Sequence, residues 1–345
     1  MTPRERFLAT LERGPVDRPA WWLGAPTPGA EQALRSYYGA PDRGALKRLL
    51  ADDVWELDIP FAKPPANHLA CAFDWVRSGY HERTLTAPGF FAGCEDPGRT
   101  SDFDWPDPVR HMDAARIRAA CAEAPPDRAR LALLWSCHLQ DLWAAFGMED
   151  ALVAMVERPA VAQAVLARIL DFYLKANRLV YEAAGRFLDA VLIGNDIGCQ
   201  TGLMLAPELV RRYMLPGTKA LIEQAHSYGI KVLHHSCGSI RPLIPDLVSA
   251  GADALHPIQA LAAGMAAEEL AGEFRDRVSF VGGLDVQELM VHGAPEAVER
   301  RVRELAALFP TGLVISPSHE ALLPDVPPEN VEAFRRAMRR LGPDR

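Results

Sequence analysis

Residues 230–257, IKVLHHSCGSIRPLIPDLVSAGADALHP, decide the fold of this chain. An apolar run at 230–235 leads into a helix-like stretch, PLIPDLVSAG, and a second apolar run follows at 252–257. A strand, a helix and another strand in close succession are typical of a parallel sheet, because the helix carries the chain back to the end where the first strand began.

The same alternation extends on both sides of this stretch. Further apolar runs lie at 189–196, 278–283 and 312–317, and a helical stretch follows each of them. In PEAVERRVRELAAL, for example, Val298, Val302 and Leu305 share one helical face. Five strand–helix units in a row therefore predict a parallel sheet.

The first half of the chain adds three candidate strands at 19–24, 54–61 and 131–135. Eight strands predict an α/β fold, a single (β/α)8 TIM barrel spanning 1–345. An open doubly wound sheet is the alternative, but no strand is followed by G-x-G-x-x-G or a P-loop. Residues 63–127, rich in Pro, Gly and Asp, are too long for a plain loop and predict an irregular insertion between the second and third strands, a candidate lid.

The composition excludes several classes of function. The formal charge is −8 and the basic residues form no patch with aromatic residues, so we expect no nucleic-acid partner. The six cysteines are widely spaced, and no apolar run approaches the roughly 18 residues of a membrane span. Because the first residues also lack an apolar signal core, we expect a cytoplasmic protein with reduced thiols and no membrane contact.

The chemistry of a parallel barrel gathers at the carboxyl ends of its strands, and the fifth predicted strand ends in His235 and Cys237. In extended backbone, residues two apart point to the same side, so the imidazole and the thiol lie together while His234 faces the helices. Imidazole and thiolate are the ligands that zinc prefers, and His319 after the eighth strand is the candidate third ligand. Two alternatives stay open: Cys237 as a nucleophile with a histidine base, and a buried thiol with no chemical role.

Other polar residues follow the remaining strands. We predict that Asp196 and Asp285 are catalytic together with His319, and that Asp196 also contacts the substrate. The alternatives are that Asp196 caps a turn, that Gln200 caps the helix that follows it, and that Asp285 lies at a helix N-terminus. We expect His256, which precedes Pro257, to be structural. The remaining residues predicted to bind the substrate are Gln200, His138 and Trp22.

Four segments, taken together, resemble the uroporphyrinogen decarboxylase superfamily, which includes methyltransferases of the methylcobamide:coenzyme M type. They are NDIGCQTGLMLAPELVRRYMLP (195–216), VLHHSCGSI (232–240), FVGGLDVQEL (280–289) and ISPSHEALLPDVPPENV (315–331). The resemblance covers most of the chain, is strongest from about residue 186 onward, and implies a TIM barrel.

The resemblance also separates two branches of that superfamily. True decarboxylases carry an arginine-rich R-Q-A-G-R-Y motif near the first strand, whereas this chain has RPAWWLGAPTPGAEQALRSYYG there. His235 and Cys237 match the H-x-C zinc ligands of the methyltransferase branch. The third ligand of the coenzyme M enzymes is a cysteine, and His319 stands at its place, where the decarboxylases have a histidine that binds no metal.

The resemblance thus implies a zinc-dependent methyltransferase that moves a methyl group between a corrinoid (cobalamin) co-substrate and a small thiol or an O- or N-methyl compound. A corrinoid protein is the expected partner, and the oligomeric state stays open, with a dimer as one option. One alternative is a metal-free decarboxylase that uses Asp196 or Asp285 as the acid. A non-catalytic barrel that binds a corrinoid is the other.

Overall fold

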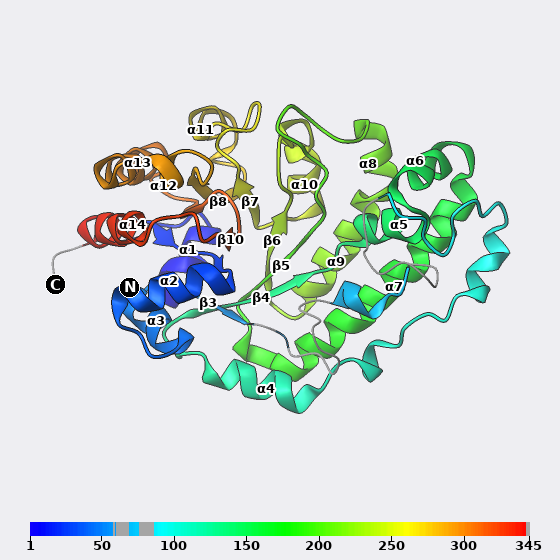
Figure 1. The fold of residues 1–345 in the computed structure, drawn as a ribbon, viewed down its shortest axis with the longest axis horizontal. Helices are drawn as coiled ribbons and strands as arrows, with labels where there is room; N and C mark the ends of the chain where they lie inside the picture. The colour runs from blue at the N-terminus through cyan, green and yellow to red at the C-terminus, as the bar shows by residue number, and fades with distance from the viewer. Residues whose placement is uncertain (58, 60–68, 76–85, 343–345) are drawn as a thin grey trace.

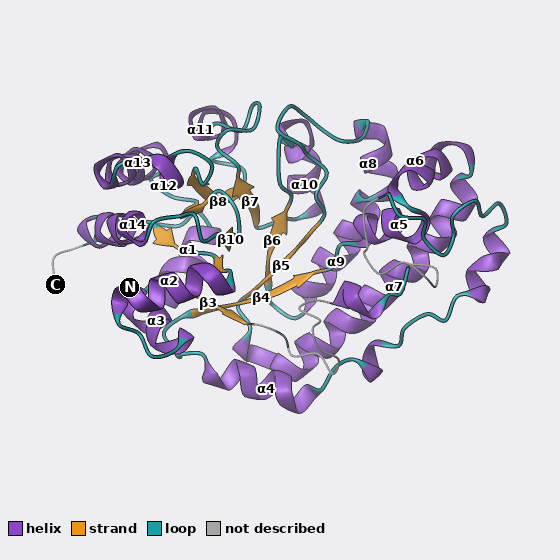
Figure 2. Cartoon of the chain, in the orientation of Figure 1, coloured by secondary structure: helices purple, strands orange, loops and turns teal. Residues whose placement is uncertain are grey.

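The computed structural model describes residues 1–57, 59, 69–75 and 86–342. Eight parallel strands form one sheet in the order β1-β9-β8-β7-β6-β5-β4-β3, with helices around it (Figures 1 and 2). The predicted TIM barrel is confirmed. The strands of this sheet are β1 (Ala20–Trp21), β3 (Val54–Leu57), β4 (Ala129–Trp135), β5 (Ala190–Gly194), β6 (Lys231–His235), β7 (Ala254–Ile258), β8 (Ser279–Leu284) and β9 (Leu313–Pro317).

Helices connect each strand to the next, as parallel pairing requires. In the first half they are α1 (Pro3–Leu11), α2 (Pro28–Tyr38), α3 (Arg43–Leu50), α4 (Ala114–Glu123), α5 (His138–Phe146), α6 (Met148–Glu157) and α7 (Pro159–Ala184). In the second half they are α8 (Pro207–Tyr213), α9 (Leu215–Ser227), α10 (Ile244–Ala250), α11 (Ala267–Phe274), α12 (Leu289–His292), α13 (Pro295–Leu308) and α14 (Pro328–Arg340). A small second sheet pairs β2 (Ala25–Pro26) with β10 (Ala321–Leu322), and 3-10 turns lie at Leu69–Ala72, Pro97–Asp102, Pro108–Arg110, Gly185–Phe187 and Arg241–Leu243.

The barrel interior is filled by side chains from alternate strand positions. On β6, Leu233 belongs to the inner cluster, whereas Val232 belongs to the outer cluster beneath the helices. Helix α1 adds Phe7 and Leu11 to the inner cluster, so it closes the amino end of the barrel. The packed interior leaves the carboxyl end as the place where polar side chains can gather.

The two edge strands, β1 and β3, meet through Asp53, which makes one backbone and one side-chain hydrogen bond to Trp21. The Asp53 N–H donates to the Trp21 carbonyl over 3.0 Å, and the Asp53 carboxylate accepts the Trp21 N–H over 2.9 Å. Arg6 and Arg18 donate to the same fully buried carboxylate over 2.6 and 2.7 Å. This ion cluster replaces the strand pairing that the two-residue β1 is too short to supply.

The insertion predicted at 63–127 is partly described. Its last part is α4, which packs on α7 through the buried Ile117 and Cys121. Before α4, aromatic rings stack on one another and on α7; Trp75 and Phe103, for instance, lie 4.8 Å apart. Asp58, which follows the second strand, lies outside the described residues, and a lid over the barrel remains a prediction.

No helix among the described residues is both long and apolar enough to cross a membrane.

Candidate metal centre

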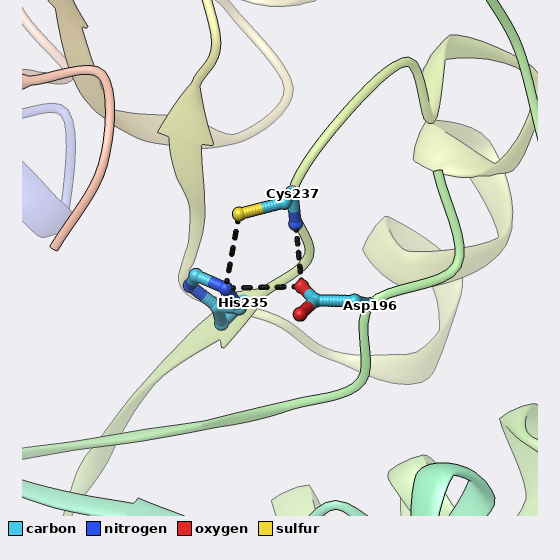
Figure 3. A group of neighbouring side chains, drawn as sticks. All are labelled: Asp196, His235 and Cys237. Carbon is cyan, nitrogen blue, oxygen red and sulfur yellow. Dashed lines mark hydrogen bonds and ion pairs between the residues drawn. The ribbon is translucent and has the colours of Figure 1, made fainter. Parts of the chain in front are cut away.

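The two residues singled out from the sequence lie together at the mouth of the barrel. His235 is the last residue of β6 and shares the inward parity of Leu233, and Cys237 follows it by two positions. The Cys237 Sγ atom lies 3.6 Å from the His235 Nε2 atom (Figure 3). The expectation that this imidazole and this thiol share one side of the strand is confirmed.

Two glycines allow the loops after β5 and β6 to approach one another. A Cβ atom on Gly194 would lie 2.0 Å from the His235 carbonyl oxygen, so only glycine fits at the end of β5. Gly238 has a φ of +81°, and a Cβ atom there would lie 2.4 Å from the Gly198 carbonyl carbon. These close approaches bring the residue after β5 next to the residues after β6.

Asp196 comes from that loop after β5 and completes the group in Figure 3. Its Oδ1 atom lies 3.2 Å from His235 Nε2 and accepts the Cys237 backbone N–H over 2.9 Å. The Gln140 side chain holds Asp196 from the other side, because its Oε1 atom accepts the Asp196 N–H over 3.1 Å. Gln140 was not predicted, and no sequence pattern links the start of α5 to the loop after β5.

His256 supports the far side of the His235 ring. The two Nδ1 atoms lie 2.8 Å apart, and His256 is fully buried in the middle of β7. Such a contact requires a hydrogen on one of the two nitrogens. A hydrogen on His235 Nδ1 leaves the Nε2 lone pair directed at Cys237 and Asp196, which is the arrangement of a metal-binding histidine with a supporting acceptor.

His319 and Glu320 approach the cluster from the end of β9. Among the described residues, the ligand atoms of Cys237, His319 and Glu320 lie within 4.8 Å of one another, as do those of Asp196, His235 and Cys237. The His319 Nδ1 atom lies 3.3 Å from the Ala321 carbonyl oxygen, and when it donates a hydrogen there the Nε2 lone pair is left for a ligand. Cys237 belongs to both groups, so it links the group of His235 to the group of His319.

Glu320 follows His319 at the end of β9 and was not among the predicted site residues. Its Oε2 atom lies 3.6 Å from His319 Nδ1 and 3.8 Å from His235 Nδ1. That atom is buried and accepts no hydrogen bond within the described part of the chain. The rule that polar residues at strand ends face the mouth is the signal that points to it.

The electrostatics of the cluster favour its charged forms. Burial opposes the charge on His235, but hydrogen bonds to Asp196 and Cys237 and the charge of Glu320 together outweigh burial and raise the pKa of the imidazole to about 10. Burial likewise opposes ionisation of Asp196, yet His235 lowers the pKa of this carboxyl to about 2.

The same balance applies to the thiol and the second histidine. Burial opposes the thiolate of Cys237, but hydrogen bonds to His235 and His319 prevail and lower the pKa of this thiol. The hydrogen bond to Cys237 raises the pKa of His319. A thiol held in this way is readily converted to the thiolate that binds metals.

The other predicted site residues occupy different surroundings. Both carboxylate oxygens of Asp285 accept backbone N–H groups, including those of Gln287 and Leu289, so Asp285 caps the turn before α12. Gln200 is exposed and donates to Gln287 over 3.3 Å. Neither residue is in a metal-ligand group among the described residues, and no contact in the structure tests whether they act on a substrate.

His138 and Trp22 are buried and bonded to the protein itself. The two ring nitrogens of His138 lie 3.2 and 3.0 Å from the carbonyl oxygens of Ser136 and Met214. The Trp22 indole N–H donates to Glu56 over 3.3 Å, and its ring lies 5.7 Å from that of His256. Their predicted contact with a substrate remains a prediction.

The donor atoms present fit a zinc ion. Zinc–sulfur and zinc–nitrogen bonds of about 2.3 and 2.05 Å at a tetrahedral angle separate the sulfur and nitrogen atoms by about 3.6 Å. The Sγ–Nε2 distance of 3.6 Å has this value, and the Oδ1–Nε2 distance of 3.2 Å is close to the about 3.4 Å expected for a carboxylate ligand. These distances fit a metal held by Asp196, His235 and Cys237, whereas His235 and His319 share no ligand group among the described residues.

The fold defines a TIM-barrel protein with a cluster of histidine, cysteine and carboxylate side chains at its mouth. Residues 144–341 match the uroporphyrinogen decarboxylase (URO-D) family, and the chain belongs to this family. The resemblance seen in the sequence is confirmed at the level of the family.

Comparison with solved structures agrees on the fold. A methyltransferase from Methanosarcina mazei is similar with a TM-score of 0.71 and 16% identity, covering 99% of both chains. A candidate vitamin-B12 independent methionine synthase from Listeria monocytogenes has a TM-score of 0.49 and 13% identity, covering 95% of this chain and 97% of that one. No curated protein sequence matches the chain.

Proposed function

We propose that the protein is a zinc-dependent methyltransferase that moves a methyl group between a corrinoid and a small thiol or an O- or N-methyl compound. The observation that carries the proposal is the 3.6 Å spacing of Cys237 Sγ and His235 Nε2 at the barrel mouth. Support also comes from family membership and from the likeness of the fold to a methyltransferase.

In this proposal His235 and Cys237 hold the metal, with His319 as the third ligand. Zinc bound there supplies a Lewis acid that lowers the pKa of a substrate thiol. His256 fixes the ring of His235, and Asp196 fixes the backbone at Cys237. These two contacts hold the ligand atoms in place before any substrate arrives.

In the proposed transfer from a methylcorrinoid to a thiol, the sulfur–carbon bond forms and the carbon–cobalt bond breaks. The electron pair of the broken bond stays on the cobalt. The thiol proton leaves to solvent through the mouth, where the side chain of Asp196 is 41% exposed. The corrinoid is a co-substrate, either free or carried by a partner protein.

The proposal is tested by incubating the zinc-loaded protein with methylcobalamin and small thiols, and by measuring the methyl thioether by mass spectrometry. Cys237→Ser should reduce the rate by at least about 100-fold, since one ligand of the Lewis acid is replaced by a weak one. Cys199→Ser is the matched control, because Cys199 is an exposed thiol in the neighbouring loop and is absent from the ligand groups of the described residues. Equal activity of Cys237→Ser and wild type would overturn the proposal.

A second candidate, a metal-free decarboxylase, is favoured by the description of the matched family. It would use Asp196 as the acid and would not need a thiolate. Carbon dioxide release from a porphyrinogen that persists in Cys237→Ala would support this candidate over the methyltransferase.

A further inference from the structure

The cluster at the barrel mouth carries two carboxylates, Asp196 and Glu320. Asp196 and Glu320 form ion pairs with His235 and His319, and in the described part of the chain neither has a Lys or Arg partner. Arg241, in the loop after β6, is paired with Glu269 and Glu273. A histidine binds a metal only in its neutral form, so His235 and His319 cannot balance the charges of the two carboxylates once zinc is bound.

The net charge of the zinc-loaded site follows from the zinc ion, the Cys237 thiolate and the two carboxylates. Zinc brings two positive charges, the Cys237 thiolate one negative charge, and Asp196 and Glu320 one negative charge each. The site therefore keeps an excess of negative charge next to the open coordination position. An anionic substrate would be repelled there, whereas a cationic one would be attracted.

The described side chains around the mouth include neutral amides and an aromatic ring. Gln140 holds Asp196, Gln259 accepts the Gly238 N–H over 2.6 Å, and Gln200 bonds to Gln287. Trp135, the last residue of β4, is half-buried with its ring 5.2 Å from that of His235. Trp135 thus adjoins the histidine that both carboxylates contact, and an aromatic ring attracts an ammonium group through its quadrupole.

We propose that the small-molecule substrate of this site carries an ammonium group, which lies between Asp196, Glu320 and the ring of Trp135. This inference rests on the proposed function, since it names the class of substrate for the same site. It separates this chain from an enzyme that takes a sulfonate, phosphate or carboxylate at the same position. Discrimination arises from repulsion of the anion as much as from attraction of the cation.

Three two-carbon thiols that differ only in charge test the inference: 2-aminoethanethiol, 2-mercaptoethanol and 2-mercaptoethanesulfonate. Their dissociation constants are measured by calorimetry with the zinc-loaded protein at low ionic strength, and methyl transfer from methylcobalamin is measured in parallel. We expect 2-aminoethanethiol to bind at least about tenfold more tightly than 2-mercaptoethanesulfonate, with 2-mercaptoethanol between them. The preference should shrink as salt is added, because part of the site is open to solvent.

Asp196→Asn and Glu320→Gln should each reduce the preference for the cationic thiol, when the variants are compared at equal zinc occupancy. Asp246→Asn, which removes one negative charge from α10 beside Arg211, is the control and should leave the preference unchanged. Tighter or equal binding of 2-mercaptoethanesulfonate by wild type would overturn the inference and leave the methyltransferase proposal intact. Failure of all three thiols to be methylated would instead contradict the proposed function and the inference together.

Discussion

Replacing His256 by leucine should weaken zinc binding without unfolding the barrel. His256 is the acceptor that faces His235 Nδ1 over 2.8 Å, and it is fully buried, so water cannot take its place. Loss of such a supporting partner typically lowers metal affinity by about 10–100-fold, or about 1.4–2.7 kcal/mol. Glu320 Oε2, 3.8 Å from the same nitrogen, can take over part of this role, so we expect a loss near about tenfold.

The neighbouring strand position supplies a matched control. His234 is also fully buried, but neither of its ring nitrogens has a hydrogen-bond partner among the described residues, and its parity places it toward the helices. His234→Leu removes two unpaired polar atoms, so it should leave zinc affinity unchanged and the stability equal or higher.

Zinc affinity of both variants is measured by competition with a chromophoric chelator, and folding by circular dichroism. Equal losses of affinity in His256→Leu and His234→Leu would refute the reasoning, because the effect would then follow from burial rather than from contact with His235. Unchanged affinity in His256→Leu would refute it equally.

Four further predictions concern the pH dependence of zinc affinity, the pH dependence of stability, the ion cluster at Asp53 and the positioning of Asp196. In the metal-free protein His235 has a pKa of about 10 and is protonated at neutral pH, so zinc binding must release that proton. Zinc affinity should therefore rise between pH 7 and 9, by up to about tenfold per pH unit. A flat profile in zinc titrations would contradict this prediction. The stability that this protonation supplies is fully present below about pH 6.5 and is lost toward about pH 10, so the difference in unfolding free energy between wild type and His235→Asn should shrink over that range. Asp53→Ala leaves Arg18 without its ion-pair partner and Arg6 paired with Asp17 alone, and it should cost about 3–5 kcal/mol, or about 4–7 °C in Tm by calorimetry. A shift under 1 °C would show that the cluster does not close the barrel. Gln140→Leu frees Asp196 and should weaken zinc binding at unchanged Tm, and a fall in Tm with unchanged affinity would assign Gln140 a purely structural role.

The strands were predictable because each is buried on both faces and therefore reads as an apolar run. The predicted 230–235 and 252–257 became β6 (Lys231–His235) and β7 (Ala254–Ile258), for example. The first strand was overestimated, since β1 ends at Trp21 and the rest of 19–24 is not strand. The Asp53 carboxylate that replaces its backbone pairing is a contact between residues far apart in sequence, and no local pattern signals it.

The site was predictable where it depends on one strand and unpredictable where it depends on two. Spacing along β6 brought His235 and Cys237 together, but the contact of His235 with His256 follows from the register of β6 against β7. Gln140 likewise reaches Asp196 across the ends of neighbouring strands. Asp285 was predicted to be catalytic, but a carboxylate at a strand end can also cap the next turn, as Asp285 does by accepting the Leu289 N–H. The sequence alone left capping and catalysis open.

The most direct test of the account is the metal itself. Protein purified without chelators should contain about one equivalent of zinc per chain, and its X-ray absorption spectrum should show one sulfur neighbour at about 2.3 Å together with nitrogen or oxygen neighbours at about 2.0–2.1 Å. Cys237→Ser should lose the sulfur neighbour and most of the zinc, while Cys199→Ser should keep both. A trace of zinc that Cys237→Ser leaves unchanged would contradict the account.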